Sequence, residues 1–249
     1  MPPSLREVAP VGRRKELLAR FTKDQVIQEE NTMKKTIAID GPAGAGKSTI
    51  VKLVAEKLGY IYIDTGAMYR AVAWKVIDTN AGTTDDKIIS TAEKLHVSLR
   101  FVGDIVRVFA DDTDVTDKIR TPEVTALVSK VAQLGPVRSK MVELQRGMAK
   151  DGGVVMDGRD IASNVLPNAD VKIFLTASIE ERALRRWKEM KAKGYDEPME
   201  KLAAEIEARD KADSERAISP LVRVPEATLL DTTGMTIDEV VQKVMELCG

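Results

Sequence analysis

The sequence predicts an α/β fold, a five-stranded parallel sheet with helices on both faces. The first observation is that an apolar stretch, a glycine-rich turn and an amphipathic stretch follow one another directly between residues 36 and 58. The second is another apolar stretch, Tyr60–Asp64, at a spacing that suits a parallel strand–helix–strand unit. The third is a set of later short apolar segments, at residues 154–157, 171–176 and 227–231. Together these segments predict five parallel strands.

The first helix is indicated by apolar residues at Ile50, Leu53, Val54 and Leu58, which lie on one helical face, and by Gly59, which would end it. After the second strand we expect Thr65 to cap a helix whose inward face carries three apolar residues, Met68, Val72 and Val76. A last helix should begin at Thr236, because Glu239 stands three residues later, as in a capping box.

A different pattern lies between the second and third parallel strands. Apolar and polar residues alternate from Leu95 to Phe101, and Gly103-Asp104 leads into a second apolar run, which predicts an antiparallel hairpin. Two helices should follow, Thr121–Leu134, with Pro122 at its first position, and Pro136–Lys150. We interpret residues 80–150 as an inserted lobe that leans over the carboxyl ends of the strands, where such sheets bind ligands.

The remaining chain divides around this lobe. Residues 33–79 and 151–249 would form the core, with a short helical lid at about 182–216. Residues 1–32 form an N-terminal extension that we expect to be helical or disordered, and Met33 is a plausible alternative start.

The glycine-rich turn matches G-x-x-x-x-G-K-[ST], the phosphate-binding loop of nucleoside triphosphate enzymes. Its glycines let backbone N–H groups surround a polyphosphate, and the helix that follows directs its positive dipole end at the same group. Lys47 would reach the β and γ phosphates, and Ser48 would bind magnesium. The residues expected to bind ATP or GTP are Gly41, Pro42, Ala43, Gly44, Ala45, Gly46, Lys47, Ser48 and Thr49.

Composition excludes several classes of protein. The 249 residues are 43% hydrophobic and 31% charged with a net charge of −1, so nothing favours nucleic acid or membrane as a partner. The sequence shows neither a membrane-spanning apolar run nor a signal peptide. The single Cys248 cannot form an internal disulfide, which fits a reducing cytoplasm. We expect a cytoplasmic monomer.

Arginines are placed where phosphate chemistry would need them. Arg159 follows a predicted strand and so lies at the ligand-binding edge of the sheet, whereas His96, the one histidine, starts a hairpin strand and is expected to be structural. Six basic residues occur between Ile179 and Lys193. They would form either a lid that closes over phosphates or a solvated, salt-bridged helix, and spacing alone leaves both open.

The sequence leaves two kinds of acceptor open for the transferred phosphoryl group, a phosphate and a hydroxyl. Many arginines without a catalytic histidine suit a phosphate acceptor, because an ionised phosphate needs no general base. A hydroxyl acceptor, as in sugar or shikimate kinases, would need a positioned carboxylate, and Asp40 and Asp64 at strand ends keep that possibility open. A GTP-dependent switch is disfavoured because no Asn-Lys-x-Asp guanine signature occurs, and Asp231-Thr-Thr-Gly234 comes after the last strand.

Several segments in order resemble the bacterial cytidylate kinases: IAIDGPAGAGKST, IDTGAMYRA, IRTPEV, DGRDI, VKIFLTASIEERALRR and RDKADSERAISPL. The resemblance runs from Thr36 to Leu247 and implies a nucleoside monophosphate kinase with a core, a monophosphate-binding insertion and a short lid. Its implied reaction is transfer of a phosphoryl group from ATP, with magnesium, to CMP or dCMP. Residues 1–32 have no counterpart in the family.

The resemblance also implies roles for single residues. The acceptor phosphate would be held by Thr65, Arg70, Arg159 and Arg216, the sugar by Arg209 and Asp213, and the base by Ser129, Arg138 and Asp160. Lys47, Arg159, Arg185 and Arg216 would assist the transfer itself. Many family members have serine where this chain has Thr65, and glycine where it has Ser48. Either Ser48 or Thr49 could therefore organise magnesium.

Overall fold

The computed structural model describes residues 34–102, 105–192 and 194–249. Predictions for the extension 1–32, for Met33, for the Gly103-Asp104 turn and for Lys193 lie outside these residues. Residues 35–249 form one compact unit. Within the described residues, no helix combines the length and the apolar character needed to cross a membrane.

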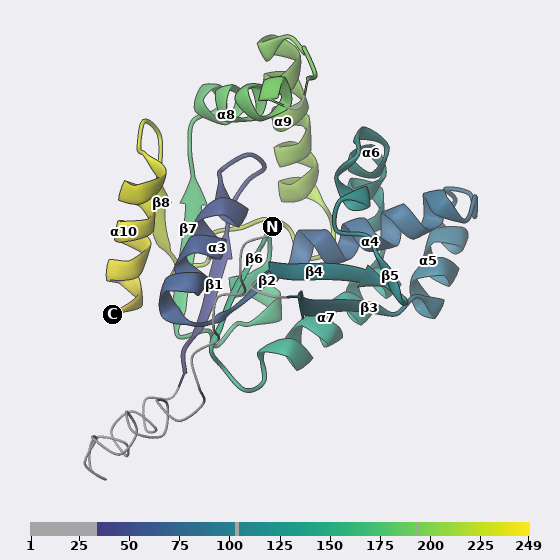
Figure 1. Cartoon of the computed structure of the whole chain (residues 1–249), viewed down its shortest axis with the longest axis horizontal. Coiled ribbons are helices and arrows are strands. Elements are labelled where there is room, and N and C mark those ends of the chain that lie inside the picture. Colours follow the sequence, from purple (N-terminus) through teal and green to yellow (C-terminus); the bar gives the residue numbers. More distant parts are fainter. Residues whose placement is uncertain (1–33, 103–104, 193) are drawn as a thin grey trace, which may run out of the picture. The chain divides into compact units, whose positions relative to one another are not determined.

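The predicted five-stranded parallel sheet is present. Its strands lie in the order β2-β6-β1-β7-β8 (Figure 1). Their bounds are Thr36–Asp40 for β1, Ile61–Asp64 for β2, Val154–Gly158 for β6, Val171–Thr176 for β7 and Thr228–Asp231 for β8. Strand β1 is central and pairs with β6 on one side and β7 on the other. The loop that follows β1 therefore emerges from the middle of the sheet, between the ends of its neighbours.

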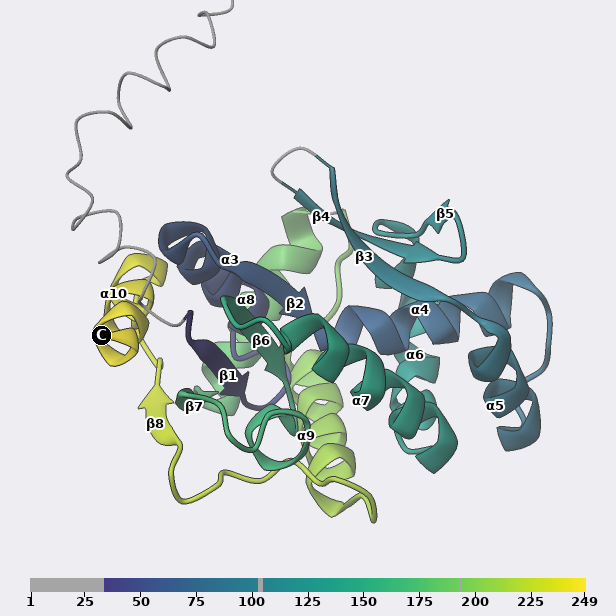
Figure 2. The same ribbon diagram turned by 90° about the horizontal axis from the view of Figure 1, so that it is seen from below.

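Alternate residues of β1 face opposite sides of the sheet. Ile37 and Ile39 pack in an apolar cluster with α3, Lys47–Leu58, and α10, Ile237–Cys248. Ala38 lies in a second cluster with residues of the short π-helix η2, Ile161–Val165, and of α7, Gly135–Ala149. Figure 2 shows α10 beside α3, with α7 on the other side of the strands. Helices thus cover both faces, as the sequence predicts.

The segment between β2 and β6 forms a second layer of structure. Strands β3, Val97–Val102, and β4, Ile105–Ala110, form the predicted antiparallel hairpin, extended by β5, Thr113–Asp114. Helix α7 also belongs to this layer, together with three further helices: α4 (Thr65–Asp78), α5 (Asp85–Lys94) and α6 (Pro122–Val131). Met68, Val72 and Val76 of α4 are buried in one apolar core with these elements. Because α4 shares this core, the boundary of the inserted lobe at residue 80 stays a prediction.

Helices α8 (Ile179–Ala192) and α9 (Met199–Glu215) pack against each other beyond the strand ends, above the loop that follows β1 (Figure 1). They occupy the position predicted for the lid. Arg209, Asp213 and Arg216 are spaced i, i+4 and i+7, which would place them on one helical face, but the helix ends at Glu215 and Arg216 is its C-cap in extended conformation. The extended backbone turns this arginine independently of the helical face.

Helix caps are mostly as predicted. Thr121 caps α6, and Thr236 with Glu239 forms a complete capping box on α10. The prediction for α4 was wrong, because Asp64 is the N-cap and accepts a hydrogen bond from Ala67 N, while Thr65 is already helical. The hydroxyl of Thr65 is thereby available for another partner. Helix α5 was not predicted, and neither were three elements of five residues or fewer: η1 (Lys118–Arg120), η2 and β5.

Candidate active site

The glycine-rich loop, residues 41–46, joins β1 to α3 at the centre of the sheet. Gly41 has φ of 152°, and a Cβ placed on it would lie 1.9 Å from the carbonyl oxygen of Leu175 on β7. Gly46, the N-cap of α3, is left-handed with φ of 87°. These positions need glycine because the loop runs tightly against β7 before it enters the helix. The result is a loop whose backbone amides precede a helix N-terminus, the arrangement that binds polyphosphates.

Lys47 lies inside this loop and is 6% exposed. Its Nζ donates to the carbonyl oxygens of Gly41, at 2.7 Å, and Pro42, at 2.8 Å. Burial, followed by the nearby charge of Arg159, lowers the pKa of Lys47 well below its ordinary value. A polyphosphate at this place would therefore supply the negative charge that the buried ammonium group lacks.

Asp157, at the end of β6, faces the start of α3. Its Oδ2 lies 3.5 Å from the hydroxyl of Ser48, and its Oδ1 accepts a hydrogen bond from the Tyr62 hydroxyl at 2.9 Å. Burial raises the pKa of Asp157 to about 7, and the nearby charge of Asp64 adds to this. Sequence reasoning missed Asp157 as a site residue. Its signal was available, because a carboxylate that ends a strand adjacent to the loop strand must lie near the loop.

The residues at this place fit magnesium by their chemistry. Magnesium prefers oxygen ligands and is commonly bound by one or two protein oxygens, with phosphate oxygens and waters completing the shell. The Ser48 hydroxyl and the Asp157 carboxylate supply two such oxygens side by side. Among the described residues, no group of three or more His, Cys, Asp or Glu side chains could hold a metal. A magnesium ion here would thus depend on a bound nucleotide.

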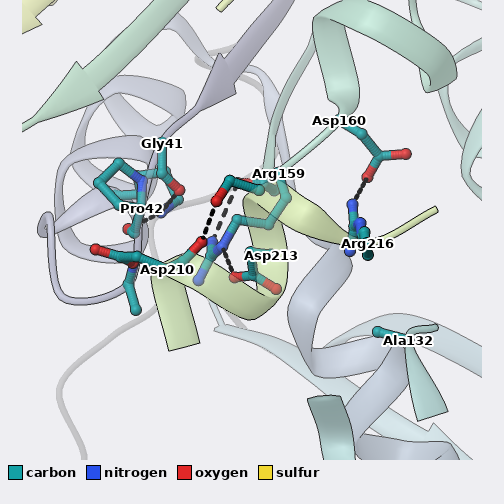
Figure 3. A network of polar contacts seen from close by, with 12 residues as sticks. Gly41, Pro42, Ala132, Arg159, Asp160, Asp210, Asp213 and Arg216 are labelled. Atoms are coloured by element: carbon teal, nitrogen blue, oxygen red, sulfur yellow. Dashed lines mark hydrogen bonds and ion pairs between the residues drawn. The ribbon is translucent and has the colours of Figure 1, made fainter. Parts of the chain in front are cut away.

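A second polar network joins the loop after β6 to α9 and α7 (Figure 3). The Nε of Arg159 donates to Asp213 at 2.8 Å. Asp160 accepts hydrogen bonds from Arg138 and, at 3.3 Å, from Arg216. Asp160 and both of its arginine partners are at least 92% buried as side chains. Arg209 of α9 lies in the same neighbourhood. The cluster then has more positive than negative charges, since it holds four arginines and two aspartates: Arg138, Arg159, Arg209, Arg216, Asp160 and Asp213.

Two arginines of this cluster, Arg209 and Arg138, have a side-chain nitrogen without a partner. Among the described residues, the Nε of each is buried without a hydrogen-bond acceptor. Burial, followed by the nearby charge of Arg159, lowers the pKa of Arg209 to about 10. Burial and neighbouring cations also lower the pKa of Arg70. A buried guanidinium nitrogen without an acceptor, placed among other cations, favours an anion site, because a bound anion would offset both costs.

Comparison with known proteins identifies the group to which this arrangement belongs. A family model for cytidylate kinases matches residues 37–249. The chain belongs to the cytidylate kinase family. A cytidylate kinase of Desulforamulus reducens is 54% identical over 86% of this chain and 96% of its own length. Those of Bacillus subtilis and Desulfitobacterium hafniense are each 51% identical over 86% of this chain, and over 96% and 94% of their own lengths.

Solved structures add little to this result. A shikimate kinase from Acinetobacter baumannii, in complex with shikimate, is 16% identical, covers 88% of this chain and 96% of its own, and has a TM-score of 0.41. A likeness at that level carries no argument. Membership of the cytidylate kinase family rests on the sequence relatives, and it makes the chain an ATP-dependent nucleoside monophosphate kinase.

The remaining residues that the cytidylate kinase resemblance assigns to the acceptor differ in their polar contacts. The Thr65 hydroxyl donates to the carbonyl oxygen of Asp157 at 2.7 Å, so it lies where the loops after β6 and β2 meet. Arg70 donates to Thr125 at 2.8 Å and to the Ile119 carbonyl at 3.2 Å. Ser129 is half-buried on α6, and none of the described polar contacts joins it to the Asp160 network.

Arg185 lies against the phosphate loop, where its Nη1 donates to the carbonyl oxygen of Ala45 at 3.4 Å. Its guanidinium donates to the side chain of Glu181 at 2.8 Å and to the carbonyl oxygen of Thr232 at 2.7 Å. Arg186, by contrast, lies near enough to Arg70 and Arg209 to lower the pKa of both. A transfer role for Arg185 therefore stays a prediction, and Arg186 is the lid arginine whose charge acts on the cationic cluster.

Asp40 and Asp64 are the carboxylates that could have served as a general base for a hydroxyl acceptor, and both are hydrogen-bonded or ion-paired within the fold. Both oxygens of Asp40 accept backbone hydrogen bonds, from Ile161 N and Ala162 N, each at 2.8 Å. Asp64 caps α4 and pairs with Arg120 at 2.9 Å. Burial raises the pKa of Asp40 to about 6. A carboxylate that holds two amide protons is a poor general base, because proton transfer would compete with those bonds.

Proposed function

We propose that the protein transfers the γ-phosphoryl group of ATP to CMP or dCMP, giving ADP and CDP or dCDP. The observation that carries this proposal is the partly buried arginine cluster of Arg70, Arg159 and Arg209, in which neighbouring positive charges lower the pKa of Arg70, of Arg209 and of Lys47 in the phosphate loop. Bringing two phosphate groups together costs about 3 kcal/mol for each pair of unit charges at about 5 Å, with an effective dielectric near 20. Several fixed cations offset that repulsion without any general base.

The acceptor phosphate is assigned to Thr65, Arg70, Arg159 and Arg216, and the sugar to Arg209 and Asp213. Arg159 is held by Asp213 at 2.8 Å, so the groups for phosphate and sugar are connected in one ion pair. Arg209 is also assigned a second role, beside the phosphoryl group that is transferred. Its charge acts on Lys47, which places it within electrostatic reach of the transferred phosphoryl group.

The base is assigned to Asp160, Arg138 and Ser129. Cytosine presents an amino donor at N4 beside acceptors at N3 and O2, whereas uracil presents O4 and N3–H in the opposite sense. A carboxylate acceptor, here Asp160, beside a guanidinium donor, here Arg138, matches cytosine. Because these groups are buried, the wrong base would leave them unpaired, and selection for cytosine should be strong.

On the ATP side, the loop amides and Lys47 are assigned to the β and γ phosphates. Ser48 and Asp157 would hold magnesium, which would neutralise charge on the phosphates of ATP. To reach a phosphate, Lys47 exchanges its bonds to the Gly41 and Pro42 carbonyls for phosphate oxygens. Closure of the proposed lid over the nucleotides would exclude water, so that transfer to the nucleotide would compete well with hydrolysis.

The test is ADP release from ATP with a panel of acceptors at equal concentration: CMP, dCMP, UMP, AMP, GMP, dTMP and shikimate. We expect turnover mainly with CMP and dCMP. Turnover mainly with another monophosphate would overturn the base assignment, and turnover with shikimate would overturn the phosphate acceptor. Release of ADP only after magnesium is added supports the metal assignment.

Two further properties accompany this proposal. We propose that the chain acts as a monomer. We also propose that it acts in a reducing compartment, which is consistent with the free, buried thiol of Cys248. The molar mass in solution, measured by light scattering, tests the first feature.

A further inference from the structure

Both polar backbone groups of Ala43, near the tip of the phosphate loop, are bound by one ion pair from the lid helices. The Ala43 N–H donates to Oδ1 of Asp210 at 3.0 Å, and the Ala43 carbonyl accepts from Nη1 of Arg182 at 2.9 Å. The same Nη1 lies 2.5 Å from Oδ2 of Asp210. Figure 3 shows Asp210 beside Pro42 and Gly41. Arg182 belongs to α8 and Asp210 to α9, so both lid helices hold one residue of the loop.

This ion pair is itself firmly anchored. The Nε of Arg182 donates to the carbonyl oxygen of Ala177, just after β7, at 2.9 Å, and Arg182 is 5% exposed. Gly44, the next loop residue, packs closely on the same two helices. A Cβ placed there would lie 3.3 Å from Cβ of Arg182 and 3.6 Å from Cδ1 of Ile206 on α9. The loop is thus fixed against α8 and α9 by polar contacts and by packing.

We propose that Arg182 and Asp210 are positioning residues for ATP: they hold the phosphate loop in its binding conformation and couple it to the lid helices. This inference rests on the proposed function, in which the loop binds the triphosphate. The pair matters because the Ala43 carbonyl, if free to turn, could point its negative end at a phosphate. With that carbonyl bound by Arg182, the amides of the following residues remain directed at the ligand.

The charge balance of the pair supports this role. A lone carboxylate beside a phosphate loop would repel ATP, but Arg182 neutralises Asp210 at 2.5 Å. Buried hydrogen-bonded ion pairs set geometry more than they add net stability, because desolvation offsets much of their attraction. Removing one partner leaves the other charge buried and unpaired, so a single substitution should also lower folding stability, and the comparison of ADP affinity with CMP affinity isolates the effect on the loop.

The experiment compares Asp210→Asn and Asp210→Ala with wild type in the full-length chain. Calorimetry measures Kd for ADP and for CMP separately, and steady-state assays measure KM for ATP. We expect Asp210→Ala to weaken ADP binding about ten-fold or more, as for loss of a charged hydrogen bond, and Asp210→Asn to fall between it and wild type. Kd for CMP should stay within about two-fold, because neither residue touches the Asp160 network.

A second ion pair between the same helices provides the comparison. Arg186 and Glu205 join α8 to α9 at 3.0 Å without contacting the loop. If Glu205→Gln weakens ADP binding as much as Asp210→Asn does, lid packing and not the contact with Ala43 is responsible, and the inference fails. Tighter ADP binding by Asp210→Asn would also overturn it, because the carboxylate would then compete with phosphate.

These outcomes separate the inference from the proposed function. If wild type binds ADP but phosphorylates none of the cytidine nucleotides, the proposed function fails and the ADP affinities still test the loop contact. Thermal unfolding checks that each variant folds. Should Asp210→Ala fail to fold, Asp210→Asn and Arg182→Lys decide the question. Lysine can replace only part of the arginine fork, so Arg182→Lys should weaken ADP binding and leave Kd for CMP unchanged, and an unaltered ADP affinity would contradict the inference.

Discussion

The Nε of Arg159 donates a hydrogen bond to Asp213 at 2.8 Å, which joins the loop after β6 to lid helix α9. The two residues lie 54 positions apart in the sequence. Because Arg159 follows a strand of the sheet and Asp213 belongs to α9, a movement of α9 relative to the sheet would move or break this ion pair. If α8 and α9 act as the proposed lid, the position of Arg159 is linked to the position of that lid.

Asp160→Ala should erode the preference for cytosine. The substitution removes the acceptor proposed for the N4 amino group and leaves the buried Arg138 and Arg216 without their shared partner. We expect the ratio of kcat/KM for CMP to that for UMP to fall by at least about ten-fold. Asn164→Ala is the control, since it removes a 3.0 Å bond to the same carboxylate but keeps the carboxylate itself. An unchanged ratio in Asp160→Ala would show that another residue reads the base.

Lys47→Ala should lower kcat by about two orders of magnitude or more, because the ammonium group is proposed to neutralise the phosphates of ATP in the transition state. Kd for CMP should change less than about three-fold. Rapid-quench assays of a single turnover measure the chemical step, and calorimetry measures CMP binding. Comparable losses in kcat and in CMP affinity would contradict the assignment of Lys47 to the ATP side.

Stability should depend on pH through Asp157. Its pKa is raised from an ordinary 3.8 to about 7, so between these values the folded chain holds a proton that the unfolded chain has released. The free energy of unfolding contributed by this group is therefore present at low pH and lost as pH rises toward 7. The difference between wild type and Asp157→Asn, measured by urea unfolding from pH 5 to 8, should become more favourable to wild type as pH falls. Its slope cannot exceed about 1.4 kcal/mol per pH unit. A flat difference would show that Asp157 titrates normally.

Ser48→Ala should raise the magnesium concentration needed for half-maximal activity more than Thr49→Ala does. Both residues are exposed on α3, but the hydroxyl of Ser48 lies 3.5 Å from the Asp157 carboxylate, and none of the described polar contacts joins Thr49 to it. We expect a shift of about ten-fold or more for Ser48→Ala, by analogy with the loss of a ligand or its close support. Titration of ADP release with magnesium measures it. The reverse order of the two variants would assign the metal to Thr49.

Gly41→Ala should destabilise the fold more than Gly59→Ala. Both glycines have positive φ, 152° and 65°, but a Cβ at Gly41 would lie 1.9 Å from the Leu175 carbonyl oxygen, and one at Gly59 would meet nothing within 4 Å. Gly59→Ala should cost about 1–2 kcal/mol, the strain of a left-handed residue. Gly41→Ala adds a backbone clash and should cost several kcal/mol by the same urea measurement. Equal costs would mean that β7 moves aside freely.

The sequence determined the local elements of this protein. The period of Ile50, Val54 and their neighbours predicted α3, alternation predicted the β3–β4 hairpin, and Thr236 with Glu239 predicted the start of α10. The phosphate loop was also readable, because its geometry depends on consecutive residues. Thr65 as a cap was wrong because Asp64 competes for the same amide from one residue earlier.

Tertiary structure alone decided which distant side chains meet. The Ser48 hydroxyl faces Asp157, 109 residues later, and the Ala43 amide meets Asp210, 167 residues later. Neither contact leaves a periodic pattern, since each depends on strand order and on the turn between α8 and α9. Arg185 and Arg186 are a further example. Adjacent positions on a helix differ by about 100°, so the packing of α8 determines that the charge of Arg186 acts on Arg70 and Arg209. Periodicity encodes backbone conformation, whereas the site arises where chain segments pack.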